Sequence, residues 1–314
     1  MGVQAIVIRD SASGAEAKVL AGFGFNCLQF RVSVRGETVN AIWSEPGFEA
    51  GDKRASGSGT PILFPYPGRL RGKTLNWNGR EYRLEGDDGR GNAIHGFVHT
   101  RPWRVVEQTD CRVVGQFWAS QDEPTLANCW PGDFRVTAAY EVSGQTLQAA
   151  YEIENPGDQP VPCGFGLHPY FCIPLGNGRG DDCRVRLPVG ARWELVDMLP
   201  TGKRLPLDSP ESYRSGLQFG EMSFDDVFTD LEFQDGVCRC RVVDPECGRK
   251  LIVEFDDAFS QCVVYNPPHR DAVCIEPYTC VPNYLELQDA GIETGLRVLE
   301  PGDLFRARMM IRVE

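Results

Sequence analysis

Apolar and polar side chains alternate along several stretches of this chain, and this period of two constrains the fold more than any other feature of the sequence. Residues 134–142 carry apolar side chains at every even position, and residues 147–153 carry them at every odd position after a Ser-Gly turn signal at 143–144. The last residues, 305–313, repeat the pattern. A strand of this kind has one buried and one solvated face, which is typical of antiparallel sheets.

Helical periodicity is almost absent, and only residues 124–130 and 284–288 favour a turn or two of helix. Strands do not alternate with helices, which argues against a parallel α/β sheet. The 34 glycines and 22 prolines suit a chain of turns and short strands. Their densest stretches are predicted to be loops between strands: 51–67, 86–91, 175–182 and 201–210.

These patterns predict an all-β fold, a large antiparallel β-sandwich with very little helix. All-β chains of this length can form one domain, and we interpret residues 1–314 as a single β-sandwich domain rather than two domains.

Charge and composition narrow the possible partners. The 32 Lys and Arg against 44 Asp and Glu give a net charge of −12, which argues against nucleic-acid and membrane partners, because both need a clustered basic surface. No apolar run approaches the ~18 residues of a membrane helix. The N-terminal residues lack a basic segment followed by an apolar one, so we expect no signal peptide and a cytoplasmic protein.

The sequence lacks the motifs that are typical of several kinds of enzyme chemistry. The sequence contains no phosphate-binding loop, dinucleotide fingerprint, G-x-S-x-G elbow or H-E-x-x-H pair. The 12 cysteines form no C-x-x-C pair and are interpreted mainly as small buried hydrophobes, with a disulfide framework as the alternative. Only four histidines are present. We therefore expect no cofactor and no metal.

Two titratable residues interrupt apolar runs where a core would not need them. His168 lies in an aromatic-rich stretch, Gly-Leu-His-Pro-Tyr-Phe at 166–171, and imidazole is the usual proton-transfer group near neutral pH. Glu276 lies in Cys-Ile-Glu-Pro-Tyr-Thr at 274–279, and a carboxylate is costly to bury unless it is paired or has a function. A structural histidine and a strand-end glutamate are the alternative interpretations.

Three further polar residues are weaker candidates. Arg69 and His95 are each embedded among apolar and turn residues, where a solvated loop arginine and a core histidine are the simpler interpretations. Asp225 and Asp226 are adjacent, so on a strand they cannot face the same side. One of the two could bind a ligand hydroxyl.

Five segments taken in order resemble the aldose 1-epimerase (galactose mutarotase) family. They are Pro-Ile-Leu-Phe-Pro-Tyr-Pro-Gly-Arg at 61–69, Ile-His-Gly at 94–96, the two stretches around His168 and Glu276, and Asp-Asp-Val-Phe at 225–228. The resemblance implies a galactose mutarotase-like β-sandwich that interconverts the α and β anomers of a free aldohexose such as glucose or galactose.

The resemblance also implies roles for the matching residues. His168 matches the general acid and Glu276 the general base, and these two would be catalytic. Arg69, His95 and Asp225 match substrate-binding residues, with Asp226 as a rival for Asp225.

The chain departs from the family pattern at two of these places. Gly68 and Cys172 stand where the family often has Asn. Arg71 and Lys73, just past Arg69, either are solvated charges or hold a sugar phosphate, as in hexose-6-phosphate 1-epimerases.

The chemistry of anomer exchange fits these residue types independently. The reaction removes the proton of the C1 hydroxyl and delivers one to the ring oxygen, so one acid and one base suffice. The expected partner is a small-molecule sugar, and the chain is a monomer or homodimer. Two other classes remain open: a glycoside hydrolase that pairs Glu276 with Asp225, and a non-catalytic carbohydrate-binding protein.

Overall fold

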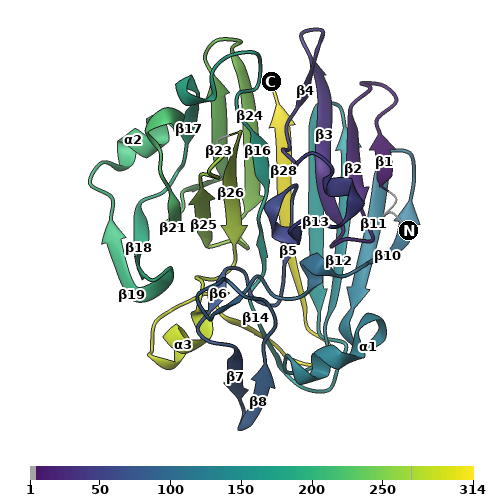
Figure 1. Ribbon diagram of the computed structural model, residues 1–314, viewed down its shortest axis with the longest axis vertical. Coiled ribbons are helices and arrows are strands. Elements are labelled where there is room, and N and C mark those ends of the chain that lie inside the picture. The colour runs from purple at the N-terminus through teal and green to yellow at the C-terminus, as the bar shows by residue number, and fades with distance from the viewer. Residues whose placement is uncertain (1–4, 270) are drawn as a thin grey trace.

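A ten-stranded antiparallel sheet forms one layer of the molecule (Figure 1). The computed structural model describes residues 5–269 and 271–314. The strands of this sheet, in spatial order, are β10 (Arg104–Gln108), β11 (Arg112–Trp118), β12 (Arg135–Ser143), β13 (Thr146–Glu154), β28 (Leu304–Val313), β24 (Arg249–Asp256), β23 (Val237–Asp244), β17 (Arg184–Arg186) and β20 (Leu217–Gln218), and β22 (Phe233–Gln234) pairs with β23.

The alternation in the sequence predicts the centre of this sheet correctly. β12 and β13 form a hairpin in which Ala138 lies opposite Tyr151, and the other edge of β13 pairs with β28, with Ala149 opposite Met309. The apolar set of each strand is buried while its polar neighbours are at least partly solvated. A one-residue shift in register would turn each apolar set to solvent, so burial fixes the pairing.

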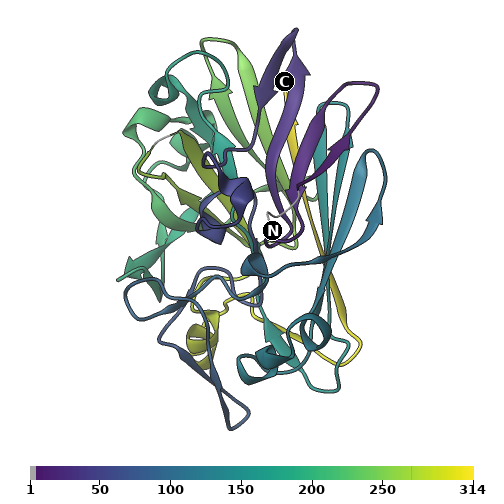
Figure 2. The same cartoon turned by 45° about the vertical axis from the view of Figure 1, so that its right-hand side comes forward.

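Two further sheets cover the inner face of the ten-stranded sheet, as the turned view in Figure 2 shows. The larger has eight strands: β19 (Leu199–Pro206), β18 (Ala191–Val196), β21 (Asp225–Thr229), β25 (Gln261–Tyr265), β26 (Ala272–Tyr278), β15 (Gly166–Leu167) and β5 (Ile62–Leu63), with β16 (Tyr170–Cys172) paired to β26. The smaller has four: β1 (Ile6–Arg9), β2 (Glu16–Leu20), β3 (Asn26–Val34) and β4 (Glu37–Asn40). One continuous apolar core joins all three sheets, which is the packing expected of a β-sandwich.

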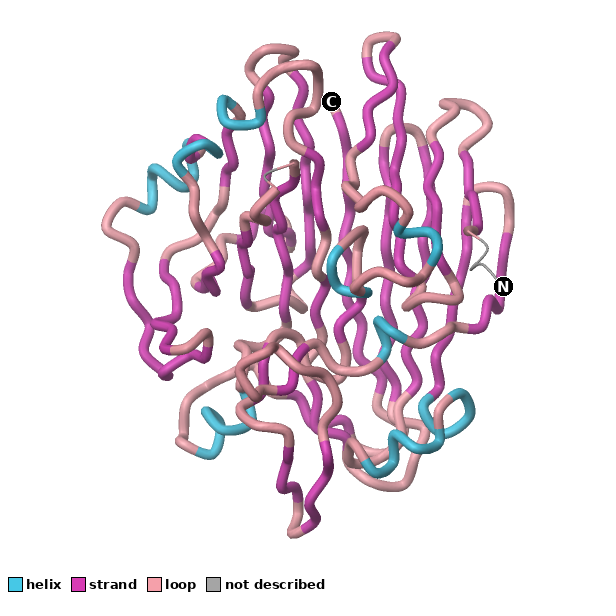
Figure 3. Tube along the Cα trace, in the orientation of Figure 1, coloured by secondary structure: helices cyan, strands magenta, loops and turns pink. Residues whose placement is uncertain are grey.

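Short elements close the ends of the sandwich. The two-stranded ladders are β6 (Arg69–Leu70) with β9 (Ala93–Ile94), β7 (Thr74–Trp77) with β8 (Arg80–Arg83), and β14 (Val161–Cys163) with β27 (Arg297–Leu299). The helices are short and peripheral (Figure 3): α1 (Ala119–Asp122), α2 (Pro210–Ser215), α3 (Tyr284–Asp289), η1 (Phe48–Ala50), η2 (Ala55–Gly57), η3 (Val98–Thr100), η4 (Pro124–Asn128), η5 (Gly180–Asp182) and η6 (Phe219–Glu221). None of the helices among the described residues has the length and apolar character needed to span a bilayer.

Two sequence-based expectations can be compared directly with these elements. All twelve cysteines are free thiols and eight of them are buried, in agreement with their interpretation as small hydrophobes. The prediction that residues 201–210 form a loop is wrong over most of its length, because β19 continues to Pro206 and α2 begins at Pro210. β19 is an edge strand with mostly solvated side chains, so it carries no apolar alternation from which to predict it.

Gly115 in β11 tests the packing between the layers. A Cβ atom at this position would lie 2.4 Å from ring atoms of Phe25, which is itself stacked on Trp103 and Tyr140. We therefore expect Gly115→Ala to lower the free energy of unfolding by about 1–3 kcal/mol through overpacking. Urea denaturation measures this change.

Gly57→Ala is the matched control. Its Cβ would meet Arg54 Cβ at 3.6 Å, an ordinary contact, and neither glycine has a positive φ. The control should change stability by no more than about 0.5 kcal/mol. Equal stability of the Gly115→Ala variant and the wild type would contradict the packing described here.

Candidate active site

Three adjacent strands of the eight-stranded sheet form the floor of an open cavity. Antiparallel pairing aligns their side chains in rows. One row is Val227, Val263 and Glu276, and the next is Asp225, Tyr265, Cys274 and, from β16, Tyr170. Residues two apart on a strand share a face, so Cys274, Glu276 and Tyr278 lie on the same face of β26.

Glu276 is almost fully buried in this floor, with 1% of its surface exposed. Its Oε2 accepts a hydrogen bond of 2.7 Å from the hydroxyl of Tyr278, and its Oε1 lies 3.4 Å from Nε2 of His168. Burial raises the pKa of Glu276 well above its ordinary value, against the lowering effect of the Tyr278 hydrogen bond.

Gly166 makes room for this arrangement. It pairs with Tyr278 across the β15–β26 ladder, and a Cβ on Gly166 would lie 2.6 Å from the Tyr278 ring. The absence of a side chain therefore leaves room for the Tyr278 ring in the position from which its hydroxyl reaches Glu276.

His168 joins β15 to β16 and faces the same cavity. Its backbone N–H donates to Pro61 O at 3.0 Å, and its ring stacks on Tyr170 with 4.9 Å between centroids and 8° between planes. Burial lowers the pKa of His168 to about 3. Its Nδ1 is buried and has no hydrogen-bond partner among the described residues.

His95 lines the same cavity, and its ring meets the ring of His168 edge-on. The ring centroids are 5.4 Å apart and the planes are nearly perpendicular, at 81°. His95 follows β9 in the left-handed region, with φ 68°, and its N–H donates to Gly68 O at 2.9 Å. Burial, followed by the charge that His168 would carry, lowers the pKa of His95 well below its ordinary value.

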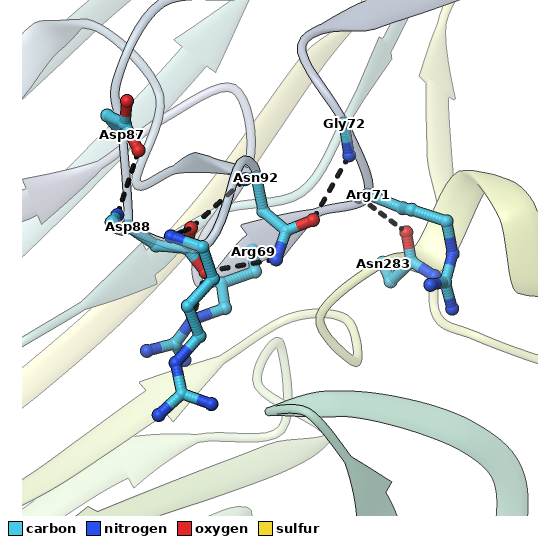
Figure 4. A network of polar contacts seen from close by, with 9 residues as sticks. Arg69, Arg71, Gly72, Asp87, Asp88, Asn92 and Asn283 are labelled. Atoms are coloured by element: carbon cyan, nitrogen blue, oxygen red, sulfur yellow. Dashed lines mark hydrogen bonds and ion pairs between the residues drawn. The ribbon is translucent and has the colours of Figure 1, made fainter.

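Arg69 is held by a buried carboxylate (Figure 4). Its Nε donates to Oδ2 of Asp88 at 3.1 Å, and Asp88 also accepts hydrogen bonds from Asn92 and from the backbone N–H of Arg90. Burial alone would raise the pKa of Asp88, but these hydrogen bonds and the charge of Arg69 lower it to about 2. Since Asp88 engages only Nε, both Nη groups of Arg69 are without a hydrogen-bond partner among the described residues and can serve the cavity that Arg69 lines.

The adjacent aspartates of β21 face opposite sides of the strand. Asp225 lines the open side of the cavity, whereas Asp226 is bound by Arg192 at 2.9 Å and does not line it. Burial within the cavity raises the pKa of Asp225, and the charge of Arg69 opposes the shift. Of the two rivals, the structure thus places Asp225 at the cavity.

The cavity brings together all five residues that the sequence singled out, namely His168, Glu276, Arg69, His95 and Asp225. It also includes Arg54, Tyr265 and Tyr278, which the sequence analysis did not select. Tyr278 could have been found, because it stands two residues after Glu276 on the same strand face. Arg54 precedes η2 in an irregular loop, and no pattern in the sequence marks it.

One group of side chains in this region has the composition of a metal site. Ligand atoms of His168, Cys274 and Glu276 all lie within 4.8 Å of one another, and the three residues are buried. The other cavity-lining polar residues suit a ligand with several hydroxyl groups, because they combine arginine and histidine donors with carboxylate acceptors.

An imidazole and a carboxyl in contact can exchange one proton each with neighbouring atoms of a ligand. The two oxygens that exchange protons when a cyclic sugar opens are both bonded to its C1 atom. An acid and a base for that reaction must therefore lie side by side, as Nε2 of His168 and Oε1 of Glu276 do at 3.4 Å.

Comparison with known proteins agrees with this architecture. The chain is 24% identical over 307 residues to the uncharacterized protein YphB of Escherichia coli (strain K12), covering 91% of this chain and 96% of that protein. It superposes with a TM-score of 0.86 on a galactose mutarotase-like protein from Clostridium acetobutylicum, at 22% identity over 98% of this chain and 95% of the other. A galactose 1-epimerase from Lactobacillus acidophilus gives a TM-score of 0.73 at 17% identity, covering 99% of both chains.

These structural similarities, all below 25% identity, show the galactose mutarotase-like fold. The sequence also identifies the family, because the family model described as aldose 1-epimerase matches residues 20–312. The chain therefore belongs to the aldose 1-epimerase family.

Proposed function

We propose that this protein is an aldose 1-epimerase that interconverts the α and β anomers of a free aldohexose such as glucose or galactose. The observation that carries the proposal is the contact between His168 and Glu276 on one wall of a sugar-sized cavity. Glu276 takes the proton of the C1 hydroxyl while His168 delivers a proton to the ring oxygen. The open-chain aldehyde turns about the C1–C2 bond and closes from the other face, and each group then reverses its role.

For this reaction, His168 and Glu276 must together hold one transferable proton. Burial raises the pKa of Glu276 and lowers that of His168, so the cavity alone favours an uncharged carboxylic acid beside a neutral imidazole. The reacting form, a carboxylate beside an imidazolium, contains the same number of protons. A bound sugar favours it by giving hydrogen bonds to the carboxylate, to which Tyr278 already donates.

The other cavity residues bind rather than transfer protons in this proposal. Arg69, fixed through Asp88, directs its Nη donors to sugar hydroxyls, and Asp225 accepts from hydroxyls on the open side. His95 lies against His168 and holds the sugar near its ring oxygen. A glycoside hydrolase pairing Glu276 with Asp225 leaves the contact between His168 and Glu276 without a role.

Removing either member of the pair should stop the reaction while leaving the sugar bound. We expect Glu276→Gln and His168→Asn each to lower kcat by about 10²–10⁴-fold, the usual contribution of a general acid or base. Polarimetry on freshly dissolved α-D-glucose and α-D-galactose measures kcat, and calorimetry measures sugar binding.

Asp226→Asn is the control, because this carboxylate is adjacent to Asp225 on β21 but is bound to Arg192 and does not line the cavity. Near wild-type turnover in either of the two pair variants rejects the assignment. A wild-type protein that binds sugar without accelerating mutarotation is instead a carbohydrate-binding protein.

The dependence of the rate on pH follows from the shared proton. Since burial lowers the pKa of His168 from its ordinary 6.5 to about 3, the pair does not take up a second proton near neutral pH. We expect kcat/KM to stay level between about pH 5.5 and 7.5, where an exposed imidazole would titrate. It should fall on the alkaline side, where Glu276 with its raised pKa loses the shared proton. An acid limb centred near the ordinary histidine value would contradict this account.

A hexose 6-phosphate is the second candidate substrate, and Arg54 is the observation that favours it. Arg54 lines the cavity, and its guanidinium forms no ion pair with any described residue and donates one hydrogen bond, to Ser56 Oγ. Arg71 and Lys73, the sequence-based candidates for a phosphate site, instead form ion pairs with Glu286 and Asp87 and do not line the cavity. Arg54 is thus the cavity cation, in addition to Arg69, that a phosphate group would meet.

Two arginine variants separate the substrates. Arg69→Ala should raise KM for free sugars and their 6-phosphates alike by about 10–100-fold, the loss of one charge-assisted hydrogen bond, with little change in kcat. Arg54→Ala should raise KM for the 6-phosphates only, and Arg54→Lys should raise this KM less than Arg54→Ala does. Steady-state polarimetry with both substrate types gives these values, and equal effects of Arg54→Ala on both types would exclude Arg54 as a phosphate ligand.

A further inference from the structure

Cys274 is a buried thiol beside the reacting pair to which the proposed reaction gives no task. It stands two residues before Glu276 on the same face of β26, and its row across the sheet contains Tyr265 on one side and Tyr170 on the other. None of its surface is exposed to solvent. The thiol therefore lies beside His168 and Glu276, beneath the surface of the cavity.

The three side chains have the composition and spacing of a zinc site. Their ligand atoms all lie within 4.8 Å of one another, and Nε2 of His168 is already 3.4 Å from Oε1 of Glu276. In a tetrahedral zinc site the ligand atoms are about 3.3–3.6 Å apart, given Zn–N and Zn–O distances near 2.1 Å and Zn–S near 2.3 Å. The thiol has to approach the other two ligands by up to about 1.2 Å.

We propose that this cluster binds Zn²⁺, or another divalent cation of similar preference for sulfur and nitrogen, and that the bound metal inhibits the enzyme. The fourth coordination position faces the cavity, where a water molecule or a sugar hydroxyl completes the tetrahedron. Metal binding stands on the geometry of the cluster. Only the inhibition rests on the proposed function.

The bound metal inhibits the enzyme because it coordinates the atoms that transfer protons. Coordination takes the lone pair of the His168 nitrogen and the charge of the Glu276 carboxylate, and both are needed for proton transfer. No bond to the sugar is made or broken by this binding. The only chemical change is the loss of the thiol proton and of the proton shared by the pair, both of which pass to solvent.

The metal also removes an electrostatic obstacle. Burial disfavours the anions of Cys274 and Glu276, and the Glu276 charge further disfavours the thiolate. A divalent cation placed between the two compensates both charges at once. The hydroxyl of Tyr278, hydrogen-bonded to Oε2 of Glu276, keeps the carboxylate oriented with Oε1 toward the cluster.

The choice of metal follows from the ligands. Thiolate and imidazole favour zinc and cobalt over magnesium and calcium, which prefer oxygen ligands. The site should thus discriminate between Zn²⁺ and Mg²⁺ at equal concentration. Co²⁺ serves as a spectroscopic substitute, because a cobalt–thiolate bond gives a charge-transfer absorption that oxygen and nitrogen ligands do not give.

The experiment compares the wild type with Cys274→Ser and Cys274→Ala, each freed of metal with a chelator. Co²⁺ binding is followed by the thiolate absorption band, and mutarotation of α-D-glucose is followed with and without Zn²⁺. We expect wild-type protein to show the band and to lose activity in Zn²⁺ but not in Mg²⁺. Both Cys274 variants should keep their basal activity and lack the band. They should also need at least about 10–100-fold more Zn²⁺ for half-inhibition, because substitutions of residues that merely support the metal ligands already lower metal affinity by that factor.

Cys262→Ala is the matched control. Cys262 is equally buried on the neighbouring strand β25, but it is adjacent to Val263 and therefore points to the other face of the sheet, where it contacts Cys240. This variant should behave as the wild type. If it, rather than the Cys274 variants, abolishes the band and the inhibition, the metal binds among the core thiols and the proposal is wrong.

The remaining outcomes are also decisive. Absence of a thiolate band in the wild type, or unchanged zinc inhibition in both Cys274 variants, overturns the proposed site. A band that depends on Cys274 in a protein without mutarotase activity supports the metal site and rejects the proposed function, so the two failures are distinguishable. Circular dichroism confirms that each variant is folded, and the serine and alanine variants replace each other if one is not.

Discussion

Antiparallel register across β21, β25 and β26 is the constraint on which the cavity depends. Each side chain on one face of a strand has a fixed neighbour on the next strand, so Glu276 must lie beside Val263 and Cys274 beside Tyr265. The register is in turn fixed by the other face, where Ile275 and Val264 are packed into the core between the layers. A shift of one residue would turn Glu276 into that core and Ile275 into the cavity. The position of the carboxyl group is thus determined by apolar contacts on the opposite side of the sheet.

The same burial that fixes the pair also sets its electrostatics. Removing water raises the free energy of any charged form, which moves the pKa of Glu276 upward and that of His168 downward. These opposite shifts let the two groups together keep one proton over a wide pH range, although neither group alone would be suited to work at neutral pH. Arg69 and Asp225 share the same cavity, and their opposite charges keep the cavity from becoming strongly positive or negative. Only Arg54 adds a cation without a described ion-pair partner.

The sequence predicts the fold class and the five selected cavity residues, but for different reasons. Period-two alternation is a direct consequence of a half-buried strand, so β12, β13 and β28 can be located from the pattern along the chain. The exposed edge strand β19 has no such alternation, and the sequence does not reveal it. His168 and Glu276 are conspicuous because burying an ionisable side chain inside an apolar run costs free energy unless the group is paired or functional.

Residues whose role comes only from proximity could not be predicted in the same way. Arg54 and His168 are far apart in the chain, and only the folded loop before η2 brings the arginine to the cavity. The cluster of Cys274 with His168 also combines two distant segments, joined by the pairing of β16 with β26. Asp225 and Asp226 can be distinguished only from the structure. The alternation of a strand predicts that the two side chains point to opposite faces, but it does not predict which of them points into the cavity.

Glu276 comes from a strand of the sheet and His168 from the link between β15 and β16, whereas Arg54, Arg69 and His95 come from loops and short ladders. Under the proposed function this division has a consequence for selectivity. Gly68, where the family often has Asn, adopts φ 67°, and a Cβ there would lie 2.7 Å from the ring of Pro282. The proline thus fills the space that a side chain at position 68 would need. That wall offers a hydrocarbon ring in place of an amide, so in the proposed function the hydrogen bonds to sugar hydroxyls come from the arginine, histidine and aspartate side chains around it. Substitutions in these loops can change which sugar fits, because the sheet register that holds Glu276 does not depend on them.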